Sequence, residues 1–190
     1  AIKKMRENSD AYSDYGDSQR ALALMERVFA SEHDDSRALS HVIRARAYAV
    51  QGDAAQALAD ADHGVAEDPK DVYTWLNRSD VRRMLGDRTG ALSDALKAIE
   101  VDAKNPYGYL IVAELYDEMG ETAQAQEYFK KLYAVEKDAL GRIPDEYLEA
   151  VDRRAYEKRM KEKKKAREAR EKEIREKLQE KSRPTDGNTE

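Results

Sequence analysis

A glycine followed by an acidic residue recurs along the chain at a fixed interval. The last three of these glycines lie 34 residues apart: Gly52, Gly86 and Gly120. An alanine follows each after five residues: Ala57, Ala91 and Ala125. Gly16 and Ala21 form an earlier copy, 36 residues before Gly52 and Ala57. An interval of this size is typical of chains that stack one structural unit on the next, so the repeat decides the fold.

Each repeating unit has the pattern of a helical hairpin. Apolar residues at helical spacing precede the glycine turn, and a second run with the same spacing follows it. The predicted units are residues 2–37, 38–71, 72–105 and 106–139. The sequence therefore predicts an all-α solenoid of about four hairpins.

The repeat resembles the tetratricopeptide repeat family over residues 2–139. Trp75 and Tyr109 stand at the family's large position in the first helix, and small residues occupy its close-contact position: Ser9, Ala45, Ser79 and Ala113. Tyr12, Tyr48 and Tyr116 fill its later aromatic position, where Arg82 is an exception. The resemblance implies a right-handed superhelix whose first helices line a concave side that binds partner segments.

Two arginine–aspartate pairs repeat at the same interval. Arg44 and Arg78 are equivalent positions in the first helices, and Asp60 and Asp94 are equivalent in the second helices. An arginine buried without a partner costs several kcal/mol, so we expect each arginine to pair with the aspartate of its own hairpin. The alternative is that Arg78 binds a carboxylate of a ligand.

The resemblance also places a set of residues on the concave side. They are Leu39, Val42, Arg46, Tyr73, Leu76, Asn77, Asp80, Arg83, Tyr107, Leu110 and Glu114. Their apolar members recur at 34-residue intervals, which predicts one continuous apolar track. An apolar track bordered by charge usually marks a binding site. The alternative is that another segment of chain covers it.

A member of the family that clamps the carboxylate tail of a chaperone is not expected. The five clamp positions, read from the second unit, hold Val42, Arg46, Asn77, Tyr107 and Ile111. Only Asn77 keeps the family's residue type. We therefore expect a more apolar partner segment.

Composition argues against an enzyme. The chain has no cysteine and three histidines, His33, His41 and His63, which do not share metal-ligand spacing. No phosphate-binding glycine loop and no nucleophile elbow is present. We expect no catalytic residues, no metal and no cofactor.

The compartment is not readable from the sequence. No apolar run approaches the roughly 20 residues that cross a bilayer, so we expect no membrane-spanning helix. A soluble, cytoplasmic location is the favoured expectation. The chain begins at Ala1 without a methionine, which is compatible with removal of a signal peptide or a preceding domain.

The repeat ends near residue 140, and the charge then changes sign. Pro144 is suited to start a helix, and no further proline occurs until Pro184, which predicts one uninterrupted helix. We expect residues 140–160 to begin it as a cap on the solenoid, residues 161–183 to extend it, and residues 184–190 to be disordered. Residues 1–143 carry 19 basic and 26 acidic side chains, whereas residues 157–183 carry 13 basic and 7 acidic ones.

The basic side chains of this helix gather at Lys161, Lys163, Lys164, Lys165 and Arg167. The helix can be a solvated rod held by pairs such as Glu157–Lys161, Glu168–Lys172 and Glu173–Lys177. A coiled coil is not expected, because no heptad of apolar residues is sustained. Binding to a nucleic acid is the other alternative, which the interleaved glutamates disfavour.

We therefore expect a non-catalytic adaptor or scaffold that binds a protein or peptide partner on the concave side. The alternative is a structural subunit of a larger assembly, such as a ribonucleoprotein, docked by its basic helix. The sequence does not indicate the partner, the biological process or the oligomeric state.

Overall fold

The computed structural model describes residues 15–30 and 37–181, and every regular element in those ranges is a helix. Seven α-helices come first: α2 Tyr15–Phe29, α3 Arg37–Gln51, α4 Ala54–Glu67, α5 Val72–Met84, α6 Arg88–Val101, α7 Pro106–Glu118 and α8 Thr122–Val135. Then follow the 3-10 helix η2 Lys137–Arg142, α9 Asp145–Val151 and α10 Arg153–Lys181. The chain divides into two compact units, Ala1–Lys137 and Asp138–Glu190.

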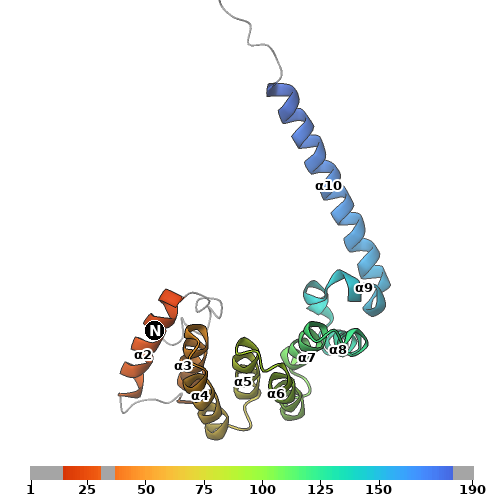
Figure 1. Cartoon of the computed structure of the whole chain (residues 1–190). Coiled ribbons are helices and arrows are strands. Elements are labelled where there is room, and N and C mark those ends of the chain that lie inside the picture. Colours follow the sequence, from red (N-terminus) through yellow and green to blue (C-terminus); the bar gives the residue numbers. More distant parts are fainter. Residues whose placement is uncertain (1–14, 31–36, 182–190) are drawn as a thin grey trace, which may run out of the picture. The chain divides into compact units, whose positions relative to one another are not determined.

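The first compact unit is a row of helical hairpins. α3 packs on α4, α5 on α6 and α7 on α8, and each hairpin contacts the next. In Figure 1 the first helices α3, α5 and α7 form one layer, with α4 and α6 beneath it. Of the predicted unit 2–37, the structure describes residues 15–30 and Arg37, the first residue of α3. Gly16 lies in the first turn of α2, so the prediction that it forms a turn before this helix is wrong. The prediction of an all-α solenoid of hairpins is confirmed.

The repeated glycines close each first helix in the same way. Gly52, Gly86 and Gly120 have φ values of 78°, 84° and 79°, a left-handed conformation that side chains disfavour. The amide of Gly86 donates to the carbonyl of Arg83, and the next amide, of Asp87, donates to that of Arg82. This Schellman closure recurs at Gly52 and Gly120. Asp87 then accepts a hydrogen bond from the amide of Gly90 and starts α6.

Small residues bring the helices of each hairpin close together. Ala57, Ala91 and Ala125 are fully buried, as is Ser79, whose hydroxyl donates to the carbonyl of Ala91. Trp75 and Tyr109, at the family's large position, each donate a hydrogen bond to a carbonyl in the loop before their helix, at Pro69 and Ala103. These two aromatic residues therefore fix the connection between one repeat and the next.

In the second and third hairpins, a buried aspartate of the second helix pairs with an arginine of the first helix, as predicted. Arg78 Nε and Nη2 donate to Asp94 at 2.9 and 2.7 Å, and Arg44 donates to Asp60 through two nitrogens at 2.5 Å each. The hydrogen bonds to Asp94 raise the pKa of Arg78 above its ordinary value despite burial, and those to Asp60 do the same for Arg44. Arg78 Nη1 donates to Asp62, so all three nitrogens of its guanidinium have protein partners.

Arg82 occupies the position at which the neighbouring repeats have tyrosine. Its Nη1 lies 3.0 Å from Asp94 and donates to the carbonyl of Gly90. Asp94 therefore receives two arginines, whereas Asp60 receives Arg44 and the ring of His41. Arg82, which replaces the aromatic residue of the other repeats, therefore supplies a second partner for the buried carboxylate of Asp94.

The second compact unit corrects one prediction. The helix expected to run without a break from Pro144 is interrupted at Asp152, whose backbone is extended (φ −151°, ψ 98°). Its amide still donates to the carbonyl of Leu148, while its side chain accepts from the amide of Ala155. Asp152 therefore ends α9 and starts α10, because an aspartate can satisfy free amides at a helix start. The tail predicted to be disordered, residues 184–190, lies outside the described residues.

Arg159 and Lys163 fasten α10 to the segment before it. Arg159 donates to the carbonyls of Leu140 and Ile143 and to Asp145, and Lys163 also donates to Asp145. These hydrogen bonds, first from Lys163 and then from Arg159, lower the pKa of Asp145 below its ordinary value. The beginning of α10 is therefore part of a folded polar cluster.

We expect Asp94→Ala to lower the free energy of unfolding by about 3 kcal/mol, because it removes the shared partner of two partly buried arginines. Chemical denaturation followed by circular dichroism measures this change. Asp62→Ala, made alone, is the matched control. It removes the other carboxylate partner of Arg78, and the side chain of Asp62 is 59% exposed. The control should cost less than about 0.5 kcal/mol. Equal losses in the two variants would contradict the assignment of Asp94 as the buried partner.

We expect Asp145 to titrate below the ordinary value of about 3.9. Because the pKa is lowered in the folded chain, the charged carboxylate of Asp145 stabilises the fold at any pH above the ordinary pKa. This stabilisation is lost as the pH falls through the lowered pKa. The carboxyl carbon chemical shift of Asp145, followed by NMR in the full chain, gives the midpoint. Lys163→Gln should raise that midpoint, and Lys164→Gln, which removes the partner of Glu168 instead, should leave it unchanged.

Candidate functional site

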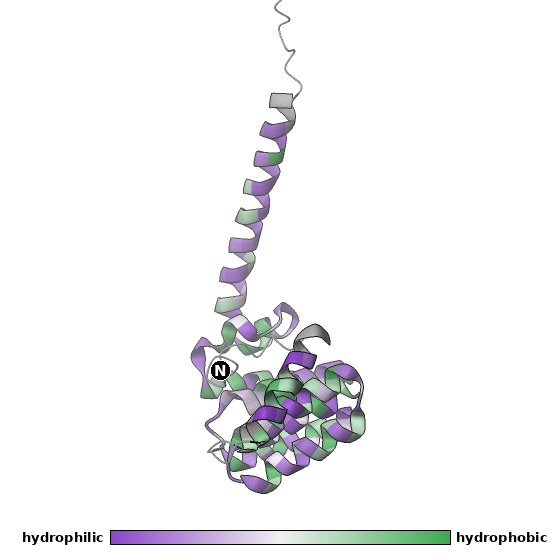
Figure 2. Ribbon diagram, turned by 90° about the vertical axis from the view of Figure 1, so that its left-hand side faces the viewer, coloured by the Kyte–Doolittle hydropathy of each residue, from purple (hydrophilic) through white to green (hydrophobic). Residues whose placement is uncertain are grey.

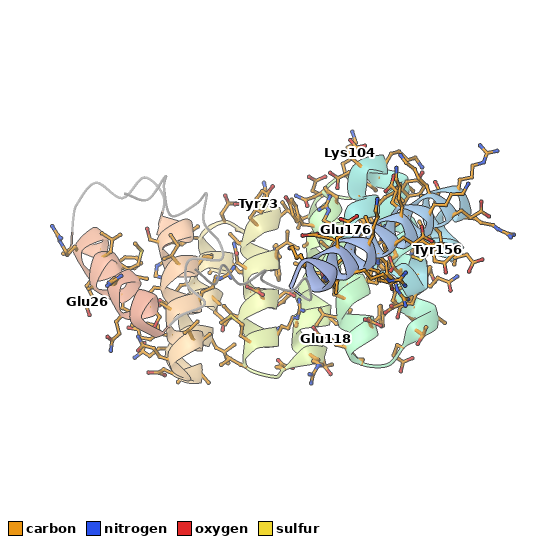
Figure 3. The ribbon with its side chains drawn as sticks, turned by 90° about the horizontal axis from the view of Figure 1, so that it is seen from above. Glu26, Tyr73, Lys104, Glu118, Tyr156 and Glu176 are labelled. Carbon is orange, nitrogen blue, oxygen red and sulfur yellow. The ribbon has the colours of Figure 1, made fainter. Side chains whose placement is uncertain are left out.

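Two tyrosines stand out on the layer of first helices. Tyr73 and Tyr107 occupy equivalent positions at the beginning of α5 and α7, and they are 50% and 48% exposed. The N-caps Asp71 and Asn105 accept hydrogen bonds from the backbone amides of these tyrosines, which fixes the start of each helix. Figure 3 shows Tyr73 near one end of these helices and Glu118 near the other. Large aromatic side chains at such positions supply contact area for a partner.

The predicted apolar track is not continuous. Val42 and Leu76 are each only 6% exposed, so they belong to the core and do not line a surface. Val42 lies against Gly64 of α4, and Leu76 packs with Val72 and Ala98. Because Val42 and Leu76 face the second helices, they do not join Tyr73 and Tyr107 into one exposed apolar surface. The prediction of a continuous track is therefore wrong.

Ion pairs cross from each first helix to the next on this layer. Arg46 of α3 lies 3.0 Å from Asp80 of α5. Arg83 of α5 lies 2.9 Å from Glu114 and 2.5 Å from Glu118, both of α7. We call this set, with Arg88, the ion-pair ladder. It brings together four of the residues predicted for the concave side: Arg46, Asp80, Arg83 and Glu114.

The ladder neutralises its own cations. Burial lowers the pKa of Arg83, but Glu118 and Glu114 outweigh this effect and hold the pKa above its ordinary value. Arg46 and Arg83 already have carboxylate partners, so a carboxylate ligand would have to displace those partners. The layer therefore favours ligands without a strong negative charge.

The remaining predicted residues contribute less. Asn77 and Leu110 are half-buried, and the side chain of Leu39 lies outside the described residues. Arg88, at the beginning of α6, was missed, although it lies 3.4 Å from Glu118 and extends the ladder. The equivalent positions hold Ala54 and Thr122, so no repeated signal could have identified it.

The predicted basic cluster on α10 is divided between paired and unpaired cations. Lys163 binds Asp145, Lys164 lies 4.0 Å from Glu168 and Arg167 lies 2.9 Å from Glu171. Lys161 and Lys165 form no ion pair with any residue that the structure describes. Figure 2 shows that α10 is hydrophilic along most of its length. Three of the five cations therefore have an acidic partner, which lowers the positive potential around the cluster.

Two of the three ion pairs predicted within α10 form with a different cation. Of the predicted pairs only Glu173–Lys177 forms, at 2.5 Å. Glu157 and Glu168 pair instead with the cations four residues before them, Arg153 and Lys164. Glu157 and Glu168 each have a cation four residues before and four residues after them, so spacing alone could not decide their partners, whereas Glu173 has Ala169 before it and pairs with Lys177 as predicted.

Two chemical properties of the described residues bear on function. Over residues 15–30 and 37–181 no group of three or more histidine, aspartate or glutamate side chains is arranged to hold a metal ion. Within the same ranges no helix combines the length and apolar character that crossing a membrane requires.

Sequence comparison alone does not identify relatives. No protein-family model matches the chain, and no curated protein matches it.

Solved structures do resemble it. The crystal structure of MamA matches 92% of this chain and 96% of its own, with a TM-score of 0.57 and 18% identity. A thermophilic tetratricopeptide repeat protein of Thermus thermophilus matches 80% of this chain and 81% of its own, with a TM-score of 0.57 and 22% identity. The first tetratricopeptide repeat domain of Spaghetti (RPAP3), solved with an HSP90 peptide, matches 64% of this chain and 97% of its own, with a TM-score of 0.52 and 17% identity. Together with the 34-residue interval, these likenesses show that the chain has the tetratricopeptide repeat fold.

Proposed function

We propose that the chain is a non-catalytic adaptor that binds a segment of a partner protein on the layer formed by α3, α5 and α7. The observation that carries this proposal is the pair of half-exposed tyrosines, Tyr73 and Tyr107, at equivalent positions of adjacent repeats. Exposed aromatic residues of this size commonly anchor interfaces. The layer offers aromatic contacts and paired charges, which suit recognition and not nucleophilic catalysis.

The partner segment is apolar and carries little negative charge. The RPAP3 domain was solved with the HSP90 peptide SRMEEVD, which contains three acidic side chains. In the present chain Arg46 and Arg83 are engaged by Asp80, Glu114 and Glu118. An acidic peptide would compete with those carboxylates, whereas apolar side chains can pack on Tyr73 and Tyr107 without disturbing them.

We expect Tyr73→Ala combined with Tyr107→Ala to weaken partner binding by about tenfold or more, since a few aromatic residues carry most of an interface's energy. Peptides are first selected from a displayed library against the full chain. Fluorescence anisotropy then measures their affinity for the parent chain and for the double variant. Selected peptides should be rich in apolar residues and poor in acidic ones.

A matched control uses exposed apolar residues outside the tyrosine pair. Met119→Ala combined with Val135→Ala removes side chains that are 41% and 39% exposed and should leave the affinity unchanged. Circular dichroism confirms that all variants are folded. Unchanged binding by the tyrosine variant, or equal losses in both variants, would place the partner site elsewhere.

The alternative function, docking to nucleic acid through the basic helix, receives less support. Three of the five predicted cations, Lys163, Lys164 and Arg167, are held by acidic side chains of the same compact unit. Pairing of this kind reduces the number of counterions that a nucleic acid can release on binding.

We therefore expect the full chain to bind single- or double-stranded oligonucleotides no more tightly than about 10 μM at physiological salt. Fluorescence anisotropy at several salt concentrations measures this affinity. A submicromolar, salt-sensitive complex that is lost when Lys161, Lys163, Lys164 and Lys165 become glutamine would favour the assembly function over the adaptor.

A further inference from the structure

The cations of α10 that lack an acidic partner are arranged in one line. Arg154, Lys158, Lys161 and Lys165 follow the spacing i, i+4, i+7, i+11, all are exposed, and none forms an ion pair with a residue in the described ranges. Residues at this spacing lie on one side of a helix, so they form a stripe about 16 Å long. We call this set the cation stripe. Two other unpaired arginines, Arg170 and Arg175, lie off it.

The cation stripe lies opposite the side of α10 that packs within its own compact unit. That packed side carries Tyr156, Arg159, Met160 and Lys163, of which Arg159 and Lys163 bind Asp145. Helical periodicity places these residues about half a turn away from the cation stripe. The folded part of the unit therefore leaves the cation stripe uncovered.

Acidic side chains border the cation stripe on both sides. Glu157 and Glu168 lie along one edge, where they are held by Arg153 and Lys164. Glu162 lies along the other edge. Neither edge carries an aromatic residue or a large apolar one between positions 157 and 168. The positive potential is thus confined to a narrow line.

We propose that the cation stripe is a docking surface for an acidic α-helix of a partner protein. A helix with carboxylates at i, i+4, i+7 and i+11 presents four anions along one line of the same length. Laid beside α10, it places those anions against the four cations, and its own neighbouring cations can meet Glu157 and Glu162. This contact is separate from the tyrosine site on the first helices.

Other polyanions fit the cation stripe less well. A nucleic acid or a membrane presents negative charge over a wide surface, so its phosphates would also approach Glu157, Glu162 and Glu168. Without an aromatic residue the stripe cannot stack on a base, and without a large apolar one it cannot insert into a bilayer. An acidic helix avoids both difficulties because its charge is as narrow as the stripe.

The test uses the full chain and a synthetic alanine-rich peptide with glutamates at i, i+4, i+7 and i+11. We expect binding at about 50 mM salt that weakens at about 200 mM, since exposed charges are screened. The stripe variant, in which Arg154, Lys158, Lys161 and Lys165 become glutamine, should bind about tenfold more weakly, as expected for the loss of four exposed ion pairs. Fluorescence anisotropy measures the affinity, and circular dichroism confirms the helix.

The matched control changes four paired cations of the same helix to glutamine: Lys164, Arg167, Lys172 and Lys177. It alters the net charge of α10 by the same amount and should retain the affinity within about threefold, since these cations already have partners. Equal loss in both variants would show that only net charge matters and would overturn the proposal. So would undetectable binding by the parent chain, or tighter binding of an oligonucleotide or of anionic phospholipid vesicles than of the peptide.

Discussion

Asp94 is the buried anion on which the third repeat depends. It receives Arg78 and Arg82 from α5, and Arg78 also reaches Asp62 on α4. One arginine therefore joins three helices from two adjacent hairpins. A buried carboxylate requires such partners, because removal from water costs more than a single hydrogen bond returns. The same requirement appears one repeat earlier, where Asp60 holds Arg44 and His41, and Arg44 in turn lies over the ring of Phe29 of α2.

In the fourth repeat an apolar contact replaces the arginine–aspartate pair between the two helices of the hairpin. Val112 and Tyr128 occupy the positions of Arg78 and Asp94, and both belong to the apolar cluster that includes Leu115. A paired charge and a well-packed apolar contact can be equivalent in stability. What the repeat preserves is the close approach of its two helices, set by the alanine and the glycine turn, and not one particular pair of side chains.

The ion-pair ladder and the hairpin pairs divide the arginines between two tasks. Arg44, Arg78 and Arg82 stabilise the interior, whereas Arg46 and Arg83 join neighbouring first helices at the surface. Tyr73 and Tyr107 are half-exposed on the same first helices. A surface whose cations are already paired selects partners by shape and apolar contact more than by charge. In α10 the opposite holds, because four cations there remain unpaired on one side, among the residues that the structure describes.

The sequence by itself determined the hairpins, their turns and the buried pairs. These features follow from local rules that recur every 34 residues, such as the left-handed glycine and the aspartate after it. Tertiary structure decided which side of each first helix is exposed: it buried Val42 and Leu76 while leaving Tyr73 half-exposed. It also decided which cations of α10 form ion pairs with Asp145. Arg159 and Lys163 reach Asp145 because α9 ends at Asp152 and α10 then packs back against the preceding segment. The contacts of Asp145 occur once, outside the 34-residue repeat, so no periodic signal in the sequence could predict them.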